Sequence, residues 1–152
     1  AEDLGVITDS VKALLKATGF AGMRVLQFAF DGNSNNPYLP YNFKENCVGY
    51  ISTHDNETLI EFEKKHKAES ERFKAYIGKT TESFNWAAIR LLMSSVANTV
   101  IFTMQDIMGQ DEKYRFNTPG TTTGNWEYRI DPSCINDWLA GILKKLTKEY
   151  GR

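Results

Sequence analysis

The 152 residues of this chain are 41% hydrophobic and 24% charged, with a formal net charge of −1, a composition typical of one globular domain with a sizeable core. This charge balance gives no argument for nucleic acid or an anionic membrane as a partner, and no apolar run approaches the roughly 20 residues of a membrane helix. Two cysteines, Cys47 and Cys134, supply neither a disulfide framework nor a zinc-ligand spacing. We therefore expect two buried free thiols in a cytoplasmic protein.

The first predicted elements are a helix, a strand and a loop. Residues 8–19 have apolar side chains at helical spacing, with Thr8 as a good N-cap and Gly19 as a suitable stop. The nearly continuous apolar run at 23–30 predicts a strand buried on both faces, as in parallel sheets. Residues 33–43 are rich in Asn, Pro and Tyr, which predicts a loop.

A second buried strand is predicted at 47–53, and it ends in His54-Asp55-Asn56. The pattern then turns helical from Asn56, although the stretch 64–71 is so polar that we expect a break or an exposed segment there. Residues 86–97 predict a largely buried helix, because apolar side chains recur on more than one face.

A third short strand is predicted at 99–104, closed by Gln105-Asp106, and a long polar loop at 113–126 follows it. The last helix is expected to begin near Asp131-Pro132. Strands that alternate with helices favour βα units on a parallel sheet, and three strands make a small sheet. The sequence therefore predicts an α/β fold that is part of a (β/α)8 barrel, with residues 1–152 as one unit and no second domain.

Polar groups follow the predicted strands directly, where barrel enzymes carry their active sites. His54-Asp55 follows the second strand, Gln105-Asp106 the third, and Asp31 the first. A carboxylate at the end of a buried strand can stabilise developing positive charge. The alternative is structural, because Asp55 or Asn56 can cap the following helix, and the residue pattern leaves both interpretations open.

Two loops and the N-terminus supply further candidates. Tyr38 and Tyr41 lie among amides in the first loop, and Trp126 lies in the long one, which is chemistry suited to sugar rings or to an ordinary connector. Glu2 is weak evidence by itself, since terminal acidic residues are usually solvated. The chain has no glycine-rich phosphate loop and no Ser or Cys nucleophile motif, so we expect neither phosphoryl nor acyl transfer, and no cofactor or metal.

Several blocks of the sequence, taken together and in order, resemble the 4-α-glucanotransferases of glycoside hydrolase family 77 (amylomaltases, or disproportionating enzymes). The blocks cover nearly the whole chain; the segment 57–83 and the last helix are the least distinctive parts. They are Ala1-Glu-Asp-Leu-Gly-Val-Ile-Thr8, Gly22-Met-Arg-Val-Leu-Gln-Phe-Ala-Phe30, Asn36-Pro-Tyr-Leu-Pro-Tyr-Asn42, Thr53-His-Asp-Asn56, Gln105-Asp106, Arg115-Phe-Asn-Thr-Pro-Gly120 and Gly124-Asn-Trp126.

The resemblance implies a (β/α)8 barrel that transfers α-1,4-glucan segments by a retaining mechanism. It implies that Glu2 is the general acid/base and that Asp55 is the carboxylate that stabilises the transition state. His54 matches a histidine that holds the sugar at the cleavage subsite, and Phe28 and Asn117 match residues lining neighbouring or acceptor subsites. The implied partner is an α-1,4-glucan or maltooligosaccharide, with neither nucleic acid nor membrane.

The same resemblance places the family's nucleophilic aspartate upstream of Ala1. The sequence is therefore expected to be the C-terminal part of a barrel, about its last three strands, and inactive alone. Two other functions stay open: a non-catalytic glucan-binding module that uses Tyr38, Tyr41 and Trp126, and part of a related α-glucan hydrolase. Exposed sheet edges also predict self-association of the chain, because an unpaired strand edge can pair with a second copy.

Overall fold

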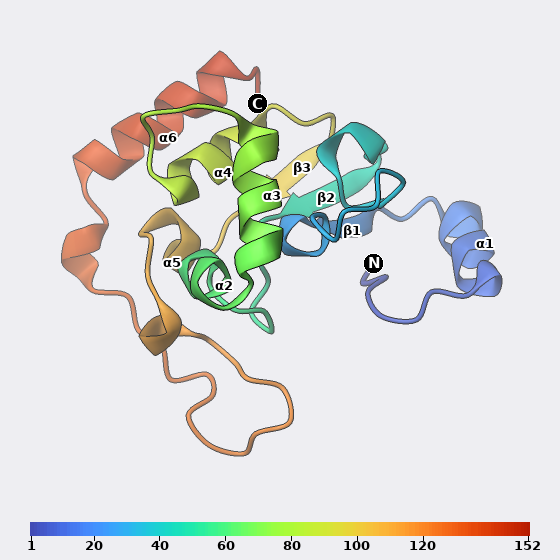
Figure 1. Cartoon of the computed structure of the whole chain (residues 1–152), viewed down its shortest axis with the longest axis horizontal. Coiled ribbons are helices and arrows are strands. Elements are labelled where there is room, and N and C mark those ends of the chain that lie inside the picture. Colours follow the sequence, from blue (N-terminus) through green and yellow to red (C-terminus); the bar gives the residue numbers. More distant parts are fainter.

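The computed structural model describes residues 1–152, which form a small parallel sheet with helices packed beside it (Figure 1). The three strands are hydrogen-bonded in the order β1-β2-β3, and both pairs are parallel, as predicted. None of the helices has the length and apolar character that a membrane crossing requires. In chain order the elements are α1 (Asp9–Thr18), β1 (Gly22–Val25), β2 (Cys47–Tyr50), α2 (Leu59–Lys65), α3 (Lys67–Ile77), α4 (Phe84–Met93), β3 (Thr99–Ile101), α5 (Met104–Ile107) and α6 (Asp137–Glu149).

The strands are shorter than the apolar runs that predict them. β1 ends at Val25, and Leu26–Phe28 form a 3-10 turn instead of the second half of the strand expected at 23–30. The side chain of Gln27 donates to the carbonyl of Glu57 over 2.8 Å, and its backbone N–H donates to Ile51 over 3.3 Å. The buried apolar side chains of the run are Val25, Leu26, Ala29 and Phe30. The chain nevertheless leaves the strand conformation after Val25 and meets the segment that follows β2.

The core lies between the sheet and helices α3 and α4. Its largest fully buried apolar side chains are Phe73, Leu26, Ile51, Leu59, Ile89 and Leu92. The sheet and α4 come close where β2 carries a glycine. A Cβ added to Gly49 would lie 2.8 Å from Cδ1 of Leu92, so the glycine permits this approach.

Helix α1 forms where predicted but buries none of its residues. Thr8 caps it by accepting from the N–H of Val11, and Gly19 ends it with φ 70°. None of its residues is buried, and Leu14 is 64% exposed. Figure 1 shows α1 set apart from the rest of the chain, beyond β1. Its apolar stripe is thus unpaired in this structure.

The observed caps revise three element boundaries. Thr58 caps α2 by accepting from the N–H of Glu61, so the alternative that Asp55 or Asn56 caps this helix is wrong. The break expected within 64–71 occurs at His66, between α2 and α3. Thr103 caps α5 and ends the third strand early, and Asn136 caps α6, whereas Asp131 caps only a preceding 3-10 turn.

Candidate active site

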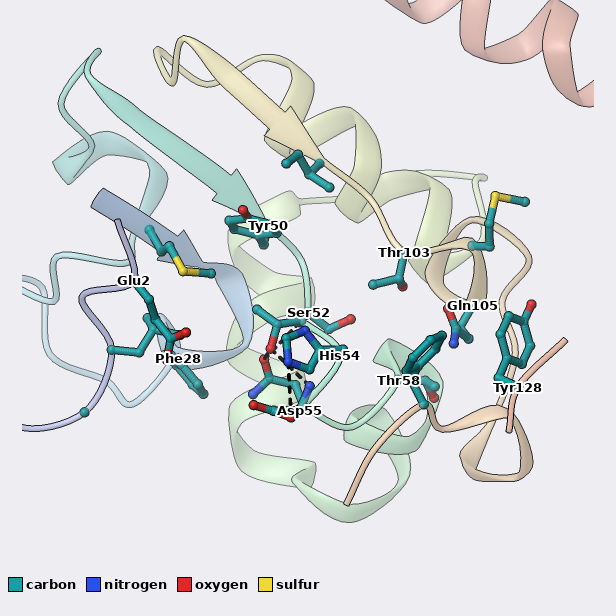
Figure 2. A pocket seen from close by; sticks show the side chains of 18 residues that line it. Glu2, Phe28, Tyr50, Ser52, His54, Asp55, Thr58, Thr103, Gln105 and Tyr128 are labelled. Carbon is teal, nitrogen blue, oxygen red and sulfur yellow. Dashed lines mark hydrogen bonds and ion pairs between the residues drawn. The ribbon is translucent and has the colours of Figure 1, made fainter. Parts of the chain in front are cut away.

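A cavity of about 710 Å³ opens at the carboxyl ends of the three strands (Figure 2). Parallel strands end at the same edge of a sheet, so segments distant in the sequence meet there. The segment after β1 contributes Phe28, the segment after β2 contributes Ser52 to Asn56, and the segment after β3 contributes Thr103 to Gln105. The N-terminal residue Glu2 lines the same cavity.

The carboxylate of Asp55 lies at the mouth of this cavity, half exposed, with two polar neighbours. The side-chain amide of Asn117 donates to its Oδ1 over 2.6 Å, and Nε2 of His54 lies 3.4 Å from the same oxygen. A charge-assisted hydrogen bond of this length orients the carboxylate. Since Thr58 caps the following helix, Asp55 has no backbone amide of that helix to satisfy and remains available to a ligand.

A tight turn holds His54 and Asp55 outward from the strand. Oδ1 of Asn56 accepts both the backbone N–H and the hydroxyl of Thr53, at 2.9 and 2.7 Å. The backbone N–H of Asp55 in turn donates to Oγ1 of Thr53 over 3.3 Å. Asn and Thr side chains commonly form such local hydrogen bonds in turns. The conformation of this turn is therefore stabilised by its own residues.

Asp106 anchors the two ends of the segment that carries His54 and Asp55. Its carboxylate accepts a short hydrogen bond from the hydroxyl of Ser52 and a 2.8 Å bond from the N–H of Leu59. Only 1% of Asp106 is exposed, and this burial raises its pKa even though its hydrogen-bond partners favour the charged form. A residue of α5 thus secures the β2–α2 connection on both sides of the turn.

Asp3 anchors the segment that carries Glu2. The Asp3 carboxylate, 9% exposed, accepts from the backbone N–H of Met23 and lies 3.3 Å from the guanidinium of Arg24. A Cβ on Gly22 would meet Oδ2 of Asp3 at 2.5 Å, so this approach requires glycine. Glu2 itself is exposed on the cavity side, where Figure 2 shows it near Phe28.

Aromatic rings surround the polar groups. The ring of Phe28 contacts Tyr38 edge-on at 5.4 Å between centroids, and Trp126 lies 5.2 Å from the ring of His54. The N–H of Trp126 donates to the carbonyl of Phe116 over 2.9 Å, which closes the base of the long loop. Trp126 is 55% exposed, so part of its ring is free to contact a ligand.

The structure brings most of the predicted site residues together. Glu2, Phe28, His54 and Asp55 line one cavity, and Asn117 bonds to Asp55. Asp31 does not join them: it is exposed, and the backbone N–H of Asn33 holds its pKa below the usual value.

Tyr41 and Cys134 give further differences from expectation. Tyr41 does not line the cavity; its hydroxyl donates to the carbonyl of Ser34. Cys47 is buried and free as expected, whereas the free Cys134 is only partly buried. No three His, Cys, Asp or Glu side chains gather as a group that could hold a metal ion.

The sequence did not predict that four further residues support the candidate site. Asp3 and Asp106 anchor the segments described above, and Glu61 and Arg115 lie beneath Asp55 and Asn117. Asp106 carried a signal, because it follows a predicted strand, but its burial did not show in the sequence. The contacts by which the other three support the site cross long stretches of the chain, from Asp3 to Met23 and from Arg115 to Glu61 and Asp55.

Comparison with protein-family models matches residues 1–135 to glycoside hydrolase family 77, described as 4-alpha-glucanotransferase. Over its whole length the chain is 46% identical to the 4-alpha-glucanotransferase of Synechocystis sp. and 43% identical to that of Clostridium butyricum. It covers 31% and 32% of these two proteins, so it spans about a third of the curated relatives it matches.

Solved structures agree with the sequence comparison. The amylomaltase from Streptococcus agalactiae in complex with acarbose matches 100% of this chain with a TM-score of 0.95 and 32% identity, and the match covers 31% of that protein. The amylomaltase from Corynebacterium glutamicum matches 82% of this chain with a TM-score of 0.57 at 16% identity, which speaks for the fold alone.

Proposed function

The chain belongs to glycoside hydrolase family 77, the 4-alpha-glucanotransferases, and from this premise we propose that it serves the transfer of α-1,4-glucan segments between maltooligosaccharide or starch- and glycogen-type chains. The observation that carries the proposal is the convergence of Glu2, Phe28, His54 and Asp55 on one cavity, with Asn117 bonded to Asp55. Such a cavity, with carboxylates beside aromatic rings, suits a sugar chain.

Each residue has a role in the proposed reaction. Glu2 protonates the glycosidic oxygen as the bond breaks and later takes the proton of the incoming hydroxyl. Asp55 stabilises the positive charge that develops on the sugar at the transition state. His54 holds the sugar at the cleavage point, and Phe28 and Asn117 line the neighbouring or acceptor subsites.

A retaining transfer also needs a nucleophilic carboxylate about 5 Å from the acid. We assign this nucleophile to no carboxylate of residues 1–152, and we propose that the rest of a family barrel supplies it. In the same proposal the parallel sheet is about the last three strands of a (β/α)8 barrel, and residues 1–152 are one part of that catalytic domain. The strand-end location of the cavity supports this, because barrel enzymes bind ligands there.

Transfer rather than hydrolysis requires that a sugar hydroxyl, not water, resolves the intermediate. A site that binds the acceptor well and limits water favours this outcome. The long loop supports it, since Phe116 lines the cavity, Trp126 packs edge-on against Phe116, and Asn117 bonds to Asp55.

The test is a chimera in which residues 1–152 replace the matching 31% of the Synechocystis relative. Incubated with maltotriose, the chimera is expected to produce glucose together with longer maltooligosaccharides. The unmodified relative controls the assay, and circular dichroism checks that the chimera is folded. A folded chimera that yields only shorter sugars would instead indicate an α-glucan hydrolase.

A second candidate, glucan binding without catalysis, draws support from the partly exposed ring of Trp126 beside His54. Calorimetry of the 152-residue chain with maltoheptaose tests it directly, and Trp126→Ala is expected to weaken any binding. The compartment is also a proposal: two free cysteines favour a reducing cytoplasm, although plant relatives are named as chloroplastic or amyloplastic.

A further inference from the structure

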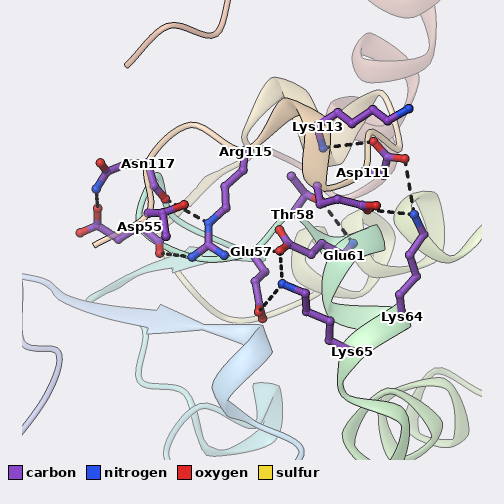
Figure 3. A network of polar contacts seen from close by, with 12 residues as sticks. Asp55, Glu57, Thr58, Glu61, Lys64, Lys65, Asp111, Lys113, Arg115 and Asn117 are labelled. Atoms are coloured by element: carbon purple, nitrogen blue, oxygen red, sulfur yellow. Dashed lines mark hydrogen bonds and ion pairs between the residues drawn. The ribbon is translucent and has the colours of Figure 1, made fainter. Parts of the chain in front are cut away.

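We propose that Glu61 and Arg115 are a pair of positioning residues that hold Asp55 and Asn117 in place, an inference that rests on the proposed function for its catalytic consequence. Neither side chain lines the cavity. Both lie in a polar network that has Asp55 and Asn117 at one end, which Figure 3 shows from close by. The pair joins helix α2 to the long loop that follows β3.

Arg115 contacts both parts of the site with one guanidinium group. Its Nη2 donates to the backbone carbonyl of Asp55 over 3.1 Å, and its Nε donates to the carbonyl of Asn117 over 3.1 Å. A guanidinium presents these donors in one rigid plane, so the two carbonyls are fixed relative to each other. The side-chain bond from Asn117 to Asp55 therefore spans two segments that Arg115 already holds together.

Glu61 sets the direction of the guanidinium. Its Oε1 lies 3.4 Å from Nη1 of Arg115 and 2.6 Å from Nζ of Lys65. The side chain of Glu61 is 4% exposed, whereas that of Arg115 is 20% exposed. Since Glu61 is fixed in the first turn of α2, the contact fixes Arg115 against the helix as well.

The second oxygen of Glu61 argues against a purely stabilising role. Oε2 is buried and has no hydrogen-bond partner. A buried carboxylate with an unpaired oxygen is costly, and ion pairs of this kind are often no more stabilising than apolar replacements. A function in orienting Arg115 accounts for a charge kept at that position.

Lys65 does not share this function, although it also contacts Glu61. Its side chain is 54% exposed, and hydrogen bonding to Glu61 raises its pKa above the usual value. Its other neighbour is Glu57, 3.7 Å away, and it bonds to neither Asp55 nor Asn117. The line of contacts to the site thus runs through Arg115 alone.

Two readouts test the pair. In the chimera, Glu61→Gln and Arg115→Lys are each expected to lower kcat about 10- to 100-fold with little change in KM for maltotriose. Lysine keeps the charge but cannot bridge both carbonyls, so it should not rescue activity. The double variant should be little worse than either single variant, because the two residues act through one contact.

In the 152-residue chain, hydrogen exchange followed by mass spectrometry tests the role of Glu61 and Arg115 without an activity assay. Peptides covering 116–126 are expected to exchange faster in both variants. The matched controls are Glu63→Gln on the same helix, which pairs with Lys74, and Arg129→Lys just beyond the long loop, whose guanidinium donates to the backbone carbonyls of Trp126 and Tyr128. Lys65→Gln should also leave kcat and exchange unchanged.

Retention of kcat and protection in Arg115→Lys, or identical behaviour of Glu61→Gln and Glu63→Gln, would overturn the proposal. Faster exchange with unchanged kcat would overturn it too, because the pair would then matter only to loop stability. A folded parent chimera without transfer products would refute the proposed function instead. Exchange in the chain itself would in that case still decide whether the pair holds Asp55 and Asn117.

Discussion

Asn117 donates its side-chain amide to the carboxylate of Asp55 over 2.6 Å, although the two residues are 62 positions apart in the sequence. The contact joins the turn after β2 to the loop after β3. One carboxylate oxygen is thereby engaged by an amide and approached by His54 at 3.4 Å. The orientation of Asp55 thus depends on a loop that is remote along the chain.

Replacing the Asp55 carboxylate by an amide should abolish most of the proposed transfer. In the chimera, Asp55→Asn is expected to lower kcat about 100- to 1000-fold, because the amide cannot balance positive charge at the transition state. Chain-length redistribution from maltotriose measures this. Asp31→Asn, an exposed carboxylate outside the cavity, is the matched control. Equal activity of the two variants would contradict the role given to Asp55.

The Glu2→Gln variant tests whether Glu2 is the general acid of the proposed reaction or only a negatively charged residue beside the cavity. We expect about a 100-fold or greater loss with maltotriose, whose leaving hydroxyl must be protonated. The 4-nitrophenolate group of a 4-nitrophenyl α-maltoside leaves without being protonated. The initial burst of nitrophenol release by the variant should therefore be largely retained. A parallel loss on both substrates would show that Glu2 is not the general acid.

Asp106 should matter mainly to stability and to the site it anchors. Asp106→Ala leaves the N–H of Leu59 and the hydroxyl of Ser52 without their acceptor, which should lower the free energy of unfolding by about 2 to 4 kcal/mol. Asp106→Asn should cost less, because an amide can serve both partners without a buried charge. Urea unfolding of the 152-residue chain measures both variants.

The pH dependence of this stability has a defined sign. Burial raises the pKa of Asp106 in the folded state, so the folded chain holds its proton more tightly than the unfolded chain. The stabilisation is fully present below the unfolded pKa, about 4, and is lost as pH rises through the folded pKa. Compared with Asp106→Asn, the unmodified chain should therefore lose stability as pH rises from about 4 toward neutrality. If the free energy of unfolding changed equally with pH in the unmodified chain and in Asp106→Asn, the raised pKa of Asp106 would be contradicted.

Gly22→Ala tests how the segment carrying Glu2 is held. The new methyl group would meet the Asp3 carboxylate at 2.5 Å, so the side chain must move and release the N–H of Met23. We expect a loss of about 1 to 3 kcal/mol in the free energy of unfolding. Gly141→Ala, with no atom near the added methyl in α6, should instead be neutral or stabilising.

The sheet edge predicts self-association of the 152-residue chain. β3 pairs only with β2, and Ile101 at its end is 46% exposed. We expect multi-angle light scattering to show dimers or larger species, and Ile101→Lys to reduce them, because a charge on an edge strand opposes pairing. A monodisperse monomer of the unmodified chain at high concentration would refute this.

Local pattern in the sequence determined the elements and the family. The Thr8 cap and Gly19 stop delimit α1, and the apolar runs predict three strands of a parallel sheet. These features depend on neighbours within one turn or one strand, so the chain itself displays them. The ordered blocks from Ala1 to Trp126 likewise carried the resemblance to family 77, which the comparisons confirm.

Only the tertiary structure decided what surrounds the candidate site. β1 stops at Val25 because Gln27 bonds to the segment after β2, and Asp55 has no capping role because Thr58 caps α2. The Glu61–Arg115 contact joins residues 54 positions apart, and the Asp106–Leu59 bond joins residues 47 apart. Such contacts form when the strand ends converge on one edge of the sheet, and no periodicity along the chain encodes them. The sequence determined which groups are available, and the packing of distant segments decided which of them meet.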